Sequence, residues 1–338
     1  ALKRLEYRGY DSAGVATVWR LEDQEPWRRE MPLRPTSLAG THSGALTVVG
    51  IDESKSSRNH ILSVRLAADD SHAIDYGLVE QVLHARLSPA ARYLAASNKQ
   101  GQLWVWKQGK TSPLWKATAA GAAARAIAFD PRETLLAVGG QQGRVEIYEA
   151  KDGAFRTTLI PSEDRQQVTA IAFDDHARQL AAGDVHGHIR LWDVVQAQVT
   201  EKLSGHTGGI RALTYSPGGA LLASASFDES VRIWKLADDA VTTLAGHGGT
   251  VSTLAFDPSG ERLAAGGFDA TVRIYDVPTG ELVAALPDNP AAIESLLFSP
   301  SGLTLAAACA DGTALLWSAA AIDRWRSDRP AAAEQAAL

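Results

Sequence analysis

The sequence predicts an all-β fold: a seven-bladed β-propeller of four-stranded antiparallel blades, with a degenerate first blade and a short C-terminal helix. The first observation is an aromatic residue that ends a short apolar run and returns every 41 to 44 residues, at Trp106, Tyr148, Trp192, Trp234, Tyr275 and Trp317. The second is a turn pair whose last residue precedes each aromatic by seventeen positions: Ser88-Pro89, Asp130-Pro131, Asp174-Asp175, Ser216-Pro217, Asp257-Pro258 and Ser299-Pro300. A period of this length with four short strands per unit is typical of propellers.

The unit over residues 205–244 illustrates the four strands. Alternation of side-chain type predicts a first strand over 210–215, followed by a turn at Ser216-Pro217-Gly218-Gly219. Further strands are expected over 221–226, 231–234 and 241–244. Because one such sheet cannot cover both of its own faces, the units should stack side by side around a ring.

A seventh, degenerate blade is expected upstream of the six clear units. His60–Leu66 fits its third strand and Leu46–Ile51 the strand before it, with an enlarged polar loop over 52–59. We expect Trp27–Leu33 to return as the outer strand of the last blade, which would close the ring and remove an exposed sheet edge. An eight-bladed ring that uses residues 12–33 is the alternative.

These patterns divide the chain into three parts. Residues 1–20 form an N-terminal segment, residues 21–318 the propeller and residues 319–338 an Ala-rich helical tail. The tail also carries three arginines and Trp325, which we interpret as a solvated helix end.

Composition limits the classes of function. The chain has 338 residues and a net charge of −6, which disfavours a general nucleic-acid binder. No apolar run is long enough to predict a membrane helix, and the single cysteine, Cys309, cannot form an internal disulfide. We expect a cytoplasmic protein, and the Ala- and Arg-rich composition suggests a bacterial genome. Since the chain begins with Ala1, its true start could be missing.

The units resemble the tryptophan–aspartate (WD) repeat over about residues 34–318. Gly205-His206, Ser216-Pro217, Asp228 and Trp234 match the landmarks of that family. The resemblance implies a hydrogen-bonded structural network of His206, Ser224, Asp228 and Trp234. The next unit keeps His247 and Asp269 but has Ala265 and Tyr275, and the last keeps Asp311 and Trp317 with Asn289 in place of histidine. The earlier blades are therefore expected to depend more on packing.

Residues 2–18 resemble something different. The string Tyr7-Arg8-Gly9-Tyr10-Asp11-Ser12-Ala13-Gly14 is similar to a segment of the glutaminase domain of glucosamine-6-phosphate synthase. The nucleophile of that family is an N-terminal cysteine upstream of this segment, and the chain has none there. We interpret the segment as a remnant or as an extra strand, and a truncated glutamine amidotransferase fused to a propeller is one alternative function.

No catalytic residue, cofactor or metal is predicted. The chain lacks the nucleophile elbow, the phosphate loop and the dinucleotide fingerprint. Asp184, His186 and His188 could converge on a metal, but their spacing is not diagnostic, and we assign them to a turn.

The remaining candidate is a protein-binding face. In the resembled family, partners often bind the face that carries the loops entering the first strand and leaving the second. Two columns map there in this chain: Leu83, Arg125, Thr169, Arg211, Ser252 and Glu294, and then Lys99, Gln141, Val185, Phe227, Phe268 and Ala310. Aromatic and arginine side chains are the usual anchors of interfaces. We therefore expect Phe227, Phe268, Arg125 and Arg211 to form a docking patch.

The sequence thus predicts a non-catalytic scaffold that binds a protein or peptide. It is expected to be a monomer or part of a larger assembly, with neither nucleic acid nor membrane as its partner. A propeller enzyme with a site in the central channel is the second alternative, and a basic face that binds nucleic acid is a third.

Overall fold

The computed structural model describes residues 27–31, 33–40, 46–52, 59–66, 71–79, 82–119, 124–244 and 246–318. In these ranges the chain forms seven four-stranded antiparallel sheets, which we number as blades 1 to 7. Blade 1 comprises β2 (Arg34–Gly40), β3 (Leu46–Asp52), β4 (Asn59–Leu66) and β5 (Ser71–Val79). Blade 2 comprises β6 (Val82–Leu87), β7 (Tyr93–Asn98), β8 (Gln102–Lys107) and β9 (Trp115–Thr118). Blade 3 comprises β10 (Ala126–Phe129), β11 (Leu135–Gly139), β12 (Val145–Glu149) and β13 (Phe155–Leu159).

Blades 4 to 7 follow the same order. They comprise β14 (Val168–Phe173), β15 (Gln179–Asp184), β16 (Ile189–Asp193) and β17 (Gln198–Leu203); β18 (Ile210–Tyr215), β19 (Leu221–Ser226), β20 (Val231–Lys235) and β21 (Ala240–Leu244); β22 (Val251–Phe256), β23 (Arg262–Gly267), β24 (Val272–Asp276) and β25 (Leu282–Leu286); and β26 (Ile293–Phe298), β27 (Thr304–Cys309), β28 (Thr313–Ser318) and β1 (Trp27–Glu30). A short 3₁₀ helix, η1 (Gln141–Gly143), lies in the turn between β11 and β12.

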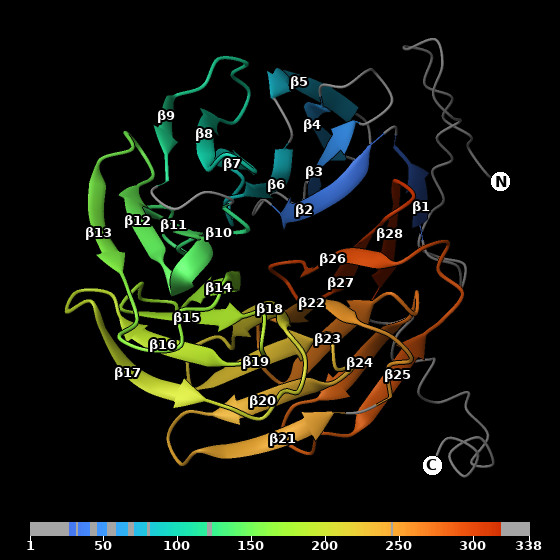
Figure 1. Cartoon of the computed structure of the whole chain (residues 1–338). Helices are drawn as coiled ribbons and strands as arrows, with labels where there is room; N and C mark the ends of the chain where they lie inside the picture. Colours follow the sequence, from blue (N-terminus) through green and yellow to red (C-terminus); the bar gives the residue numbers. More distant parts are fainter. Residues whose placement is uncertain are drawn as a thin grey trace, which may run out of the picture.

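The blades form a closed ring around a central axis (Figure 1). The first strand of each blade contacts the first strand of the next, in the order β2, β6, β10, β14, β18, β22 and β26, and β26 contacts β2 again. The first strands therefore surround the axis, and the fourth strands form the outer edge. The seven-bladed prediction is confirmed.

Blade 7 takes its outer strand from the beginning of the described chain. Strand β1 pairs antiparallel with β28, with Trp27 opposite Leu316 and Glu30 opposite Thr313. The Met31 amide extends this pairing by donating to the Gly312 carbonyl at 2.8 Å. The expected closure of the ring is thus confirmed. The eight-bladed alternative is wrong, because residues 27–30 complete blade 7 and β2 packs directly on β26.

The apolar core lies between the blades. Each of the seven apolar clusters among the described residues combines side chains from two neighbouring blades, and together the clusters cover all seven blade junctions. Trp234 of blade 5, for example, packs in one cluster with Ile189 and Leu191 of blade 4. Small residues such as Ala223 and Ala264 are fully buried on the second strands, where large side chains would keep the blades apart.

Blade 1 departs most from the others. Its third and fourth strands, β4 and β5, have 8 and 9 residues, whereas the corresponding strands of blade 5 have 5 each. Residues 53–58 of the enlarged loop (52–59), the N-terminal segment 1–20 and the predicted C-terminal helical tail 319–338 lie outside the described residues. No helix in the described part of the chain is long and apolar enough to cross a membrane.

Candidate functional site

A hydrogen-bonded network ties together the rim of blade 5. His206 lies between Asp228 and Ser224, with Nδ1 2.8 Å from the Asp228 carboxylate and Nε2 2.7 Å from the Ser224 hydroxyl. The Trp234 indole donates to the same hydroxyl at 2.8 Å. The four residues expected from the sequence are therefore joined in a continuous chain from the surface turn to the buried indole.

The network has a marked effect on its titratable groups. Burial alone would raise the pKa of Asp228, but hydrogen bonds from Ser230, the Thr207 amide and His206 lower it to about 2. Burial lowers the pKa of His206, and its contact with Asp228 opposes that effect only in part. Asp228 is therefore a carboxylate that orders the rim, and its oxygens accept hydrogen bonds from within the blade.

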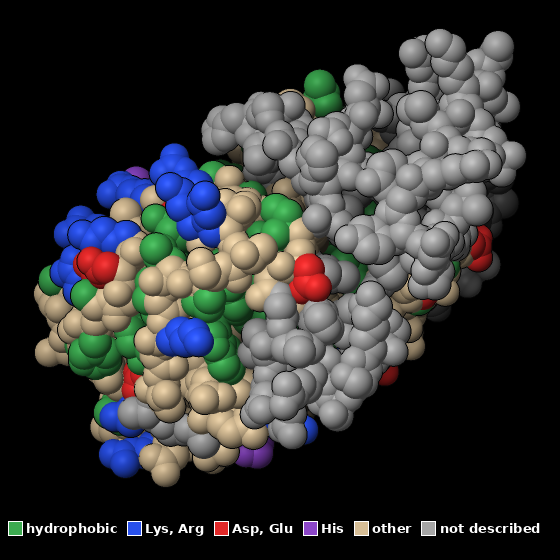
Figure 2. Space-filling view, turned by 90° about the horizontal axis from the view of Figure 1, so that it is seen from above, with side chains coloured by type: hydrophobic (Ala, Val, Ile, Leu, Met, Phe, Trp, Pro, Cys, Tyr) green, Lys and Arg blue, Asp and Glu red, His purple; other side chains and the backbone are tan. Residues whose placement is uncertain are grey.

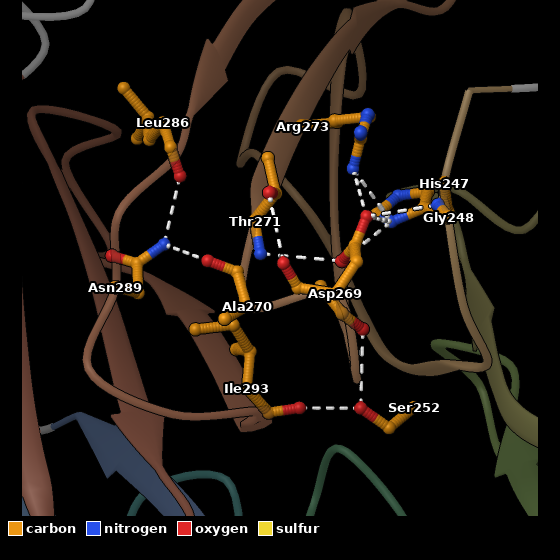
Figure 3. Close-up of polar contacts among 11 residues, drawn as sticks. His247, Gly248, Ser252, Asp269, Ala270, Thr271, Arg273, Leu286, Asn289 and Ile293 are labelled. Atoms are coloured by element: carbon orange, nitrogen blue, oxygen red, sulfur yellow. Dashed lines mark hydrogen bonds and ion pairs between the residues drawn. The ribbon is translucent and has the colours of Figure 1, made fainter.

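Blade 6 carries a different version of the network (Figure 3). Asp269 accepts from Arg273 Nη1 at 2.5 Å and lies 3.2 Å from His247 Nδ1. The residue at the Ser224 position is Ala265, and His247 Nε2 is buried without a hydrogen-bond partner. Burial and the charge of Arg273 lower the pKa of His247, although Asp269 opposes the shift.

Blade 7 does not join its two corresponding residues by a hydrogen bond. Asn289, at the histidine position, donates to the carbonyls of Ala270 at 2.7 Å and of Leu286 at 2.8 Å. Asp311 instead accepts from the amide and hydroxyl of Thr313, at 2.9 Å and 3.0 Å. Asn289 therefore links its loop to the turn of blade 6, as Figure 3 also shows. Trp317, expected to complete this network, is buried in the cluster shared by blades 6 and 7.

The two columns predicted for the binding face lie on the same rim of the ring. Backbone amides that follow the second strand donate to carbonyls that precede the first strand of the same blade. The bonds are Val185 to Gln167 at 3.1 Å, Phe227 to Gly209 at 3.0 Å, Phe268 to Thr250 at 2.9 Å and Ala310 to Ala292 at 2.8 Å. This repeated bond brings the two kinds of loop together in blades 4 to 7.

The first column coincides with β-bulges. The pairing of the first and second strands shifts at Leu83, Thr169, Arg211, Ser252 and Glu294, and also at Thr36 in blade 1. A bulge places an extra residue opposite one partner and redirects its side chain. Strict alternation therefore could not predict where these side chains point.

Two residues of that column hold neighbouring blades together. The Thr169 hydroxyl donates to the Ile210 carbonyl of blade 5 at 2.6 Å. Ser252 is buried, and its hydroxyl donates to the Ile293 carbonyl of blade 7. Both hydroxyls are therefore used between blades, and the role of Thr169 and Ser252 on the binding face stays a prediction.

Phe227 and Phe268 are exposed on adjacent blades. Their exposed fractions are 51% and 54%, which is high for aromatic side chains beside a tight turn. Each lies over a glycine of the facing loop: a Cβ on Gly208 would come within 3.1 Å of the Phe227 Cβ, and one on Gly249 within 3.7 Å of the Phe268 Cβ. The Arg211 guanidinium lies over the Phe227 ring, 5.5 Å from its centroid.

The other residues of the two columns vary in exposure. Arg125, Lys99, Gln141 and Val185 are exposed, whereas Leu83, Glu294 and Ala310 are half-buried. Glu294 forms an ion pair with Arg34 of blade 1, with 3.6 Å between Oε1 and Nη2.

Sequence reasoning overlooked a basic group on the first strands. Arg34 on β2 and Arg86 on β6 are exposed, and His84, also on β6, is half-buried. Burial, followed by the charges of Arg211, Arg86, Arg125 and Arg34, lowers the pKa of His84 to about 4. The sequence contained a signal for this basic group, because Glu294 is the single acid on the seven first strands. That excess of basic over acidic residues is visible only when the first strands are compared with one another.

The candidate metal ligands serve a turn. Asp184 accepts from the amides of His186 and His188 at 2.9 Å and 3.1 Å, and its second oxygen accepts from Arg190 at 3.1 Å. Within the described ranges, no group of three metal-ligating side chains converges. Cys309 is fully buried among apolar residues of blades 6 and 7.

The closed ring of seven four-stranded sheets defines a β-propeller. Comparison with protein families then gives the class. The WD domain, G-beta repeat, matches residues 155–193, 197–235, 239–276 and 280–318, and the WD40 domain of anaphase-promoting complex subunit 4 matches residues 85–165. Between residues 85 and 318 the chain therefore matches WD repeats. Each matched WD repeat combines the outer strand of one blade with the three inner strands of the next, which is the same offset that makes β1 the outer strand of blade 7.

Similar curated proteins share only part of their length with this chain. Transducin beta-like protein 3 of Bos taurus is 28% identical over 159 residues, which is 46% of this chain and 20% of that protein. Periodic tryptophan protein 2 homolog of Schizosaccharomyces pombe is 40% identical over 83 residues, or 24% of this chain and 10% of that protein. Cell division cycle 20.6, cofactor of APC complex, of Arabidopsis thaliana is 27% identical over 171 residues, or 47% and 39%.

Two expectations gain no support from these comparisons. The relatives are eukaryotic, so they do not support a bacterial origin. The family matches lie within residues 85–318, and none of the three relatives named above is a glutaminase by name, so the resemblance of residues 2–18 is not carried further.

Proposed function

We propose that the chain is a non-catalytic scaffold that docks a partner protein or peptide on the rim of the ring, at the loops of blades 3, 5 and 6. The patch consists of Phe227, Phe268, Arg211 and Arg125. One observation carries the proposal: two phenylalanine rings on neighbouring blades are about half exposed on one rim. Large aromatic side chains that face solvent together favour a binding surface, since they bury much apolar area when a partner covers them.

The local structure supports a preformed surface. The amides of Phe227 and Phe268 are fixed by hydrogen bonds to the facing loops, and the network of blade 5 fixes the turn at Asp228. A partner would therefore order few residues on binding, which limits the entropic cost. The printed name of the Arabidopsis relative describes a cofactor of a complex, and we infer a comparable role within an assembly for this chain.

The test removes the two rings. Phe227→Ala/Phe268→Ala should abolish capture of partners from the lysate of source cells, measured by quantitative mass spectrometry on the immobilised full chain. Its melting temperature should change little, because both side chains are exposed. The matched control is Val195→Ala/Leu303→Ala. It shortens two exposed apolar side chains in turns of the opposite rim and should leave capture intact. Equal capture by all three proteins would refute the docking patch.

A further inference from the structure

Four arginines gather where the first strands surround the axis. Arg34 lies on β2, Arg86 on β6, Arg211 on β18, and Arg125 directly before β10. Arg125 and Arg211 hold equivalent places, since each lies six positions before the last residue of a turn pair. These strands belong to four different blades, and the closed contact ring brings all of them to one axis.

The charges of all four arginines act on one residue, His84. The pKa of His84 on β6 responds to Arg211 on β18, three blades away, and to Arg125 and Arg34 on two further blades. Among the residues of the seven first strands the single acid is Glu294, which already pairs with Arg34 at 3.6 Å. The axis is therefore strongly positive, although the whole chain carries a net charge of −6.

Such a concentration of guanidinium groups is unfavourable without a counter-charge. The Nε of Arg211 is buried and makes no hydrogen bond, and its guanidinium lies over the Phe227 ring. Arg86 and Arg125 are exposed and can receive an anion. The groups come from separate strands, so they suit several carboxylates along a chain better than one compact ion.

We propose that the partner is an acidic peptide segment whose Asp and Glu carboxylates bind Arg125, Arg211 and Arg86 at the axis, while a neighbouring apolar residue packs on Phe227 and Phe268. The inference rests on the proposed docking function and specifies the chemistry of the partner. Arg211 joins the two parts of the site, since it lies on β18, one of the strands that surround the axis, and its guanidinium contacts the Phe227 ring. Charge complementarity of this kind sets specificity and association rate.

The experiment uses the full chain and fluorescent degenerate peptides with selected positions fixed as Glu, Gln or Lys. Glu peptides should bind more tightly than matched Gln peptides, and the difference should shrink as salt rises. Arg125→Glu/Arg211→Glu should weaken the Glu peptides by about tenfold or more and leave the Gln peptides nearly unchanged. Arg125→Gln/Arg211→Gln is the milder variant, should the charge reversal disturb folding.

Two further variants control the interpretation. Lys110→Glu/Lys116→Glu makes the same change in net charge at exposed residues on or beside the outer strand β9, and should not alter peptide affinity. The control is needed because basic side chains also gather on the outer edge of the ring, as Figure 2 shows in its edge view. Glu294→Gln removes the one carboxylate on the seven first strands and should strengthen binding of the Glu peptides.

The outcomes separate this inference from the docking patch. Loss of all peptide binding in Phe227→Ala/Phe268→Ala, with equal affinity for Glu and Gln peptides, would keep the patch and overturn the acidic partner. Tighter binding of a single-stranded DNA oligonucleotide than of any peptide would overturn it in favour of nucleic acid. A library from which no peptide is retained would count against both proposals.

Discussion

At the residue scale, one hydroxyl distinguishes the complete network from the incomplete ones. Ser224 lies opposite Arg232 on β20, and Ala265 lies opposite Arg273 in the equivalent place on β24. With alanine there, His247 Nε2 is buried without a partner, and the indole nitrogens of Trp106 and Trp192 are in the same state beside Ala96 and Ala182. Leaving such a group unpaired costs about 1–3 kcal/mol.

Restoring the hydroxyl should therefore stabilise blade 6. We expect Ala265→Ser to raise the free energy of unfolding by about 1 kcal/mol, because the new hydroxyl supplies a partner for His247 Nε2. Urea denaturation measures the change. The control Ala264→Ser places a hydroxyl on the adjacent, equally buried residue of the same strand, which faces the other side, and should destabilise. A lower stability for Ala265→Ser than for Ala264→Ser would contradict the assignment.

His84 gives stability a dependence on pH. Its pKa falls from 6.5 to about 4 in the folded chain, so between these values the unfolded chain binds more protons. The stability that depends on neutral His84 is fully present above pH 6.5 and is lost as the pH falls to about 4. Protonation would add a fifth positive charge beside Arg211, Arg86, Arg125 and Arg34.

His84→Gln should reduce this loss. The variant cannot titrate, so its melting temperature should fall less than that of the wild type between about pH 7 and pH 5. The melting temperature of both proteins should still fall as the pH is lowered, because the pKa values of His206 and His247 are also lowered. If the melting temperature falls equally with pH in the variant and the wild type, the surroundings of His84 do not keep it neutral.

The landmarks predicted the residue contacts of blade 5 because they sit at fixed offsets from turns. The same offsets did not predict Asn289, whose amide reaches the carbonyl of Ala270 in the neighbouring blade. Nor did they predict the blade-to-blade bonds of Thr169 and Ser252. Contacts between units depend on how the ring closes, and a single unit carries no information about that.

At the element scale, the closure of blade 7 depends on a glycine. Gly312 has a φ of +91°, which disfavours any other residue, and a Cβ there would come within 2.2 Å of the Met31 carbonyl beside β1. The turn between β27 and β28 is therefore shaped to let the returning strand approach. The periodic pattern predicted where β1 lies, but it gave no sign of this close approach.

Gly312→Ala should destabilise the chain by more than the cost of placing an alanine at a positive φ. Gly218→Ala is the matched control, since Gly218 has a φ of +82° and no atom lies within 4 Å of its added Cβ. The control should cost about 1 kcal/mol, and Gly312→Ala clearly more, because the clash separates β1 from β28. Thermal unfolding of the two variants gives the comparison, and equal losses would mean that β1 does not constrain the turn.

At the scale of the whole molecule, stability depends on an unbroken ring. Every apolar cluster of the described residues is shared by two blades, so no blade has a core of its own. Each unit can cover its faces only with neighbouring units, so all repeats must join one ring. The number of repeats therefore predicted the number of blades. Composition and period could not show the positive axis, which exists only after four blades bring their arginines together.

Removal of the returning strand should open the ring. A chain that starts at residue 34 lacks β1 together with the buried Met31 and Leu33, whereas a chain that starts at residue 27 keeps all of them. The shorter chain should melt at a lower temperature and self-associate, because the edge of β28 loses its partner. Calorimetry and light scattering on the two chains measure both effects.

The variant Met31→Ala/Leu33→Ala separates the causes of these two effects. It should lower the melting temperature through lost burial and yet stay monomeric, because β1 still covers the edge of β28. Self-association of that variant to the same degree would mean that apolar packing, and not the strand pairing, protects the seventh blade.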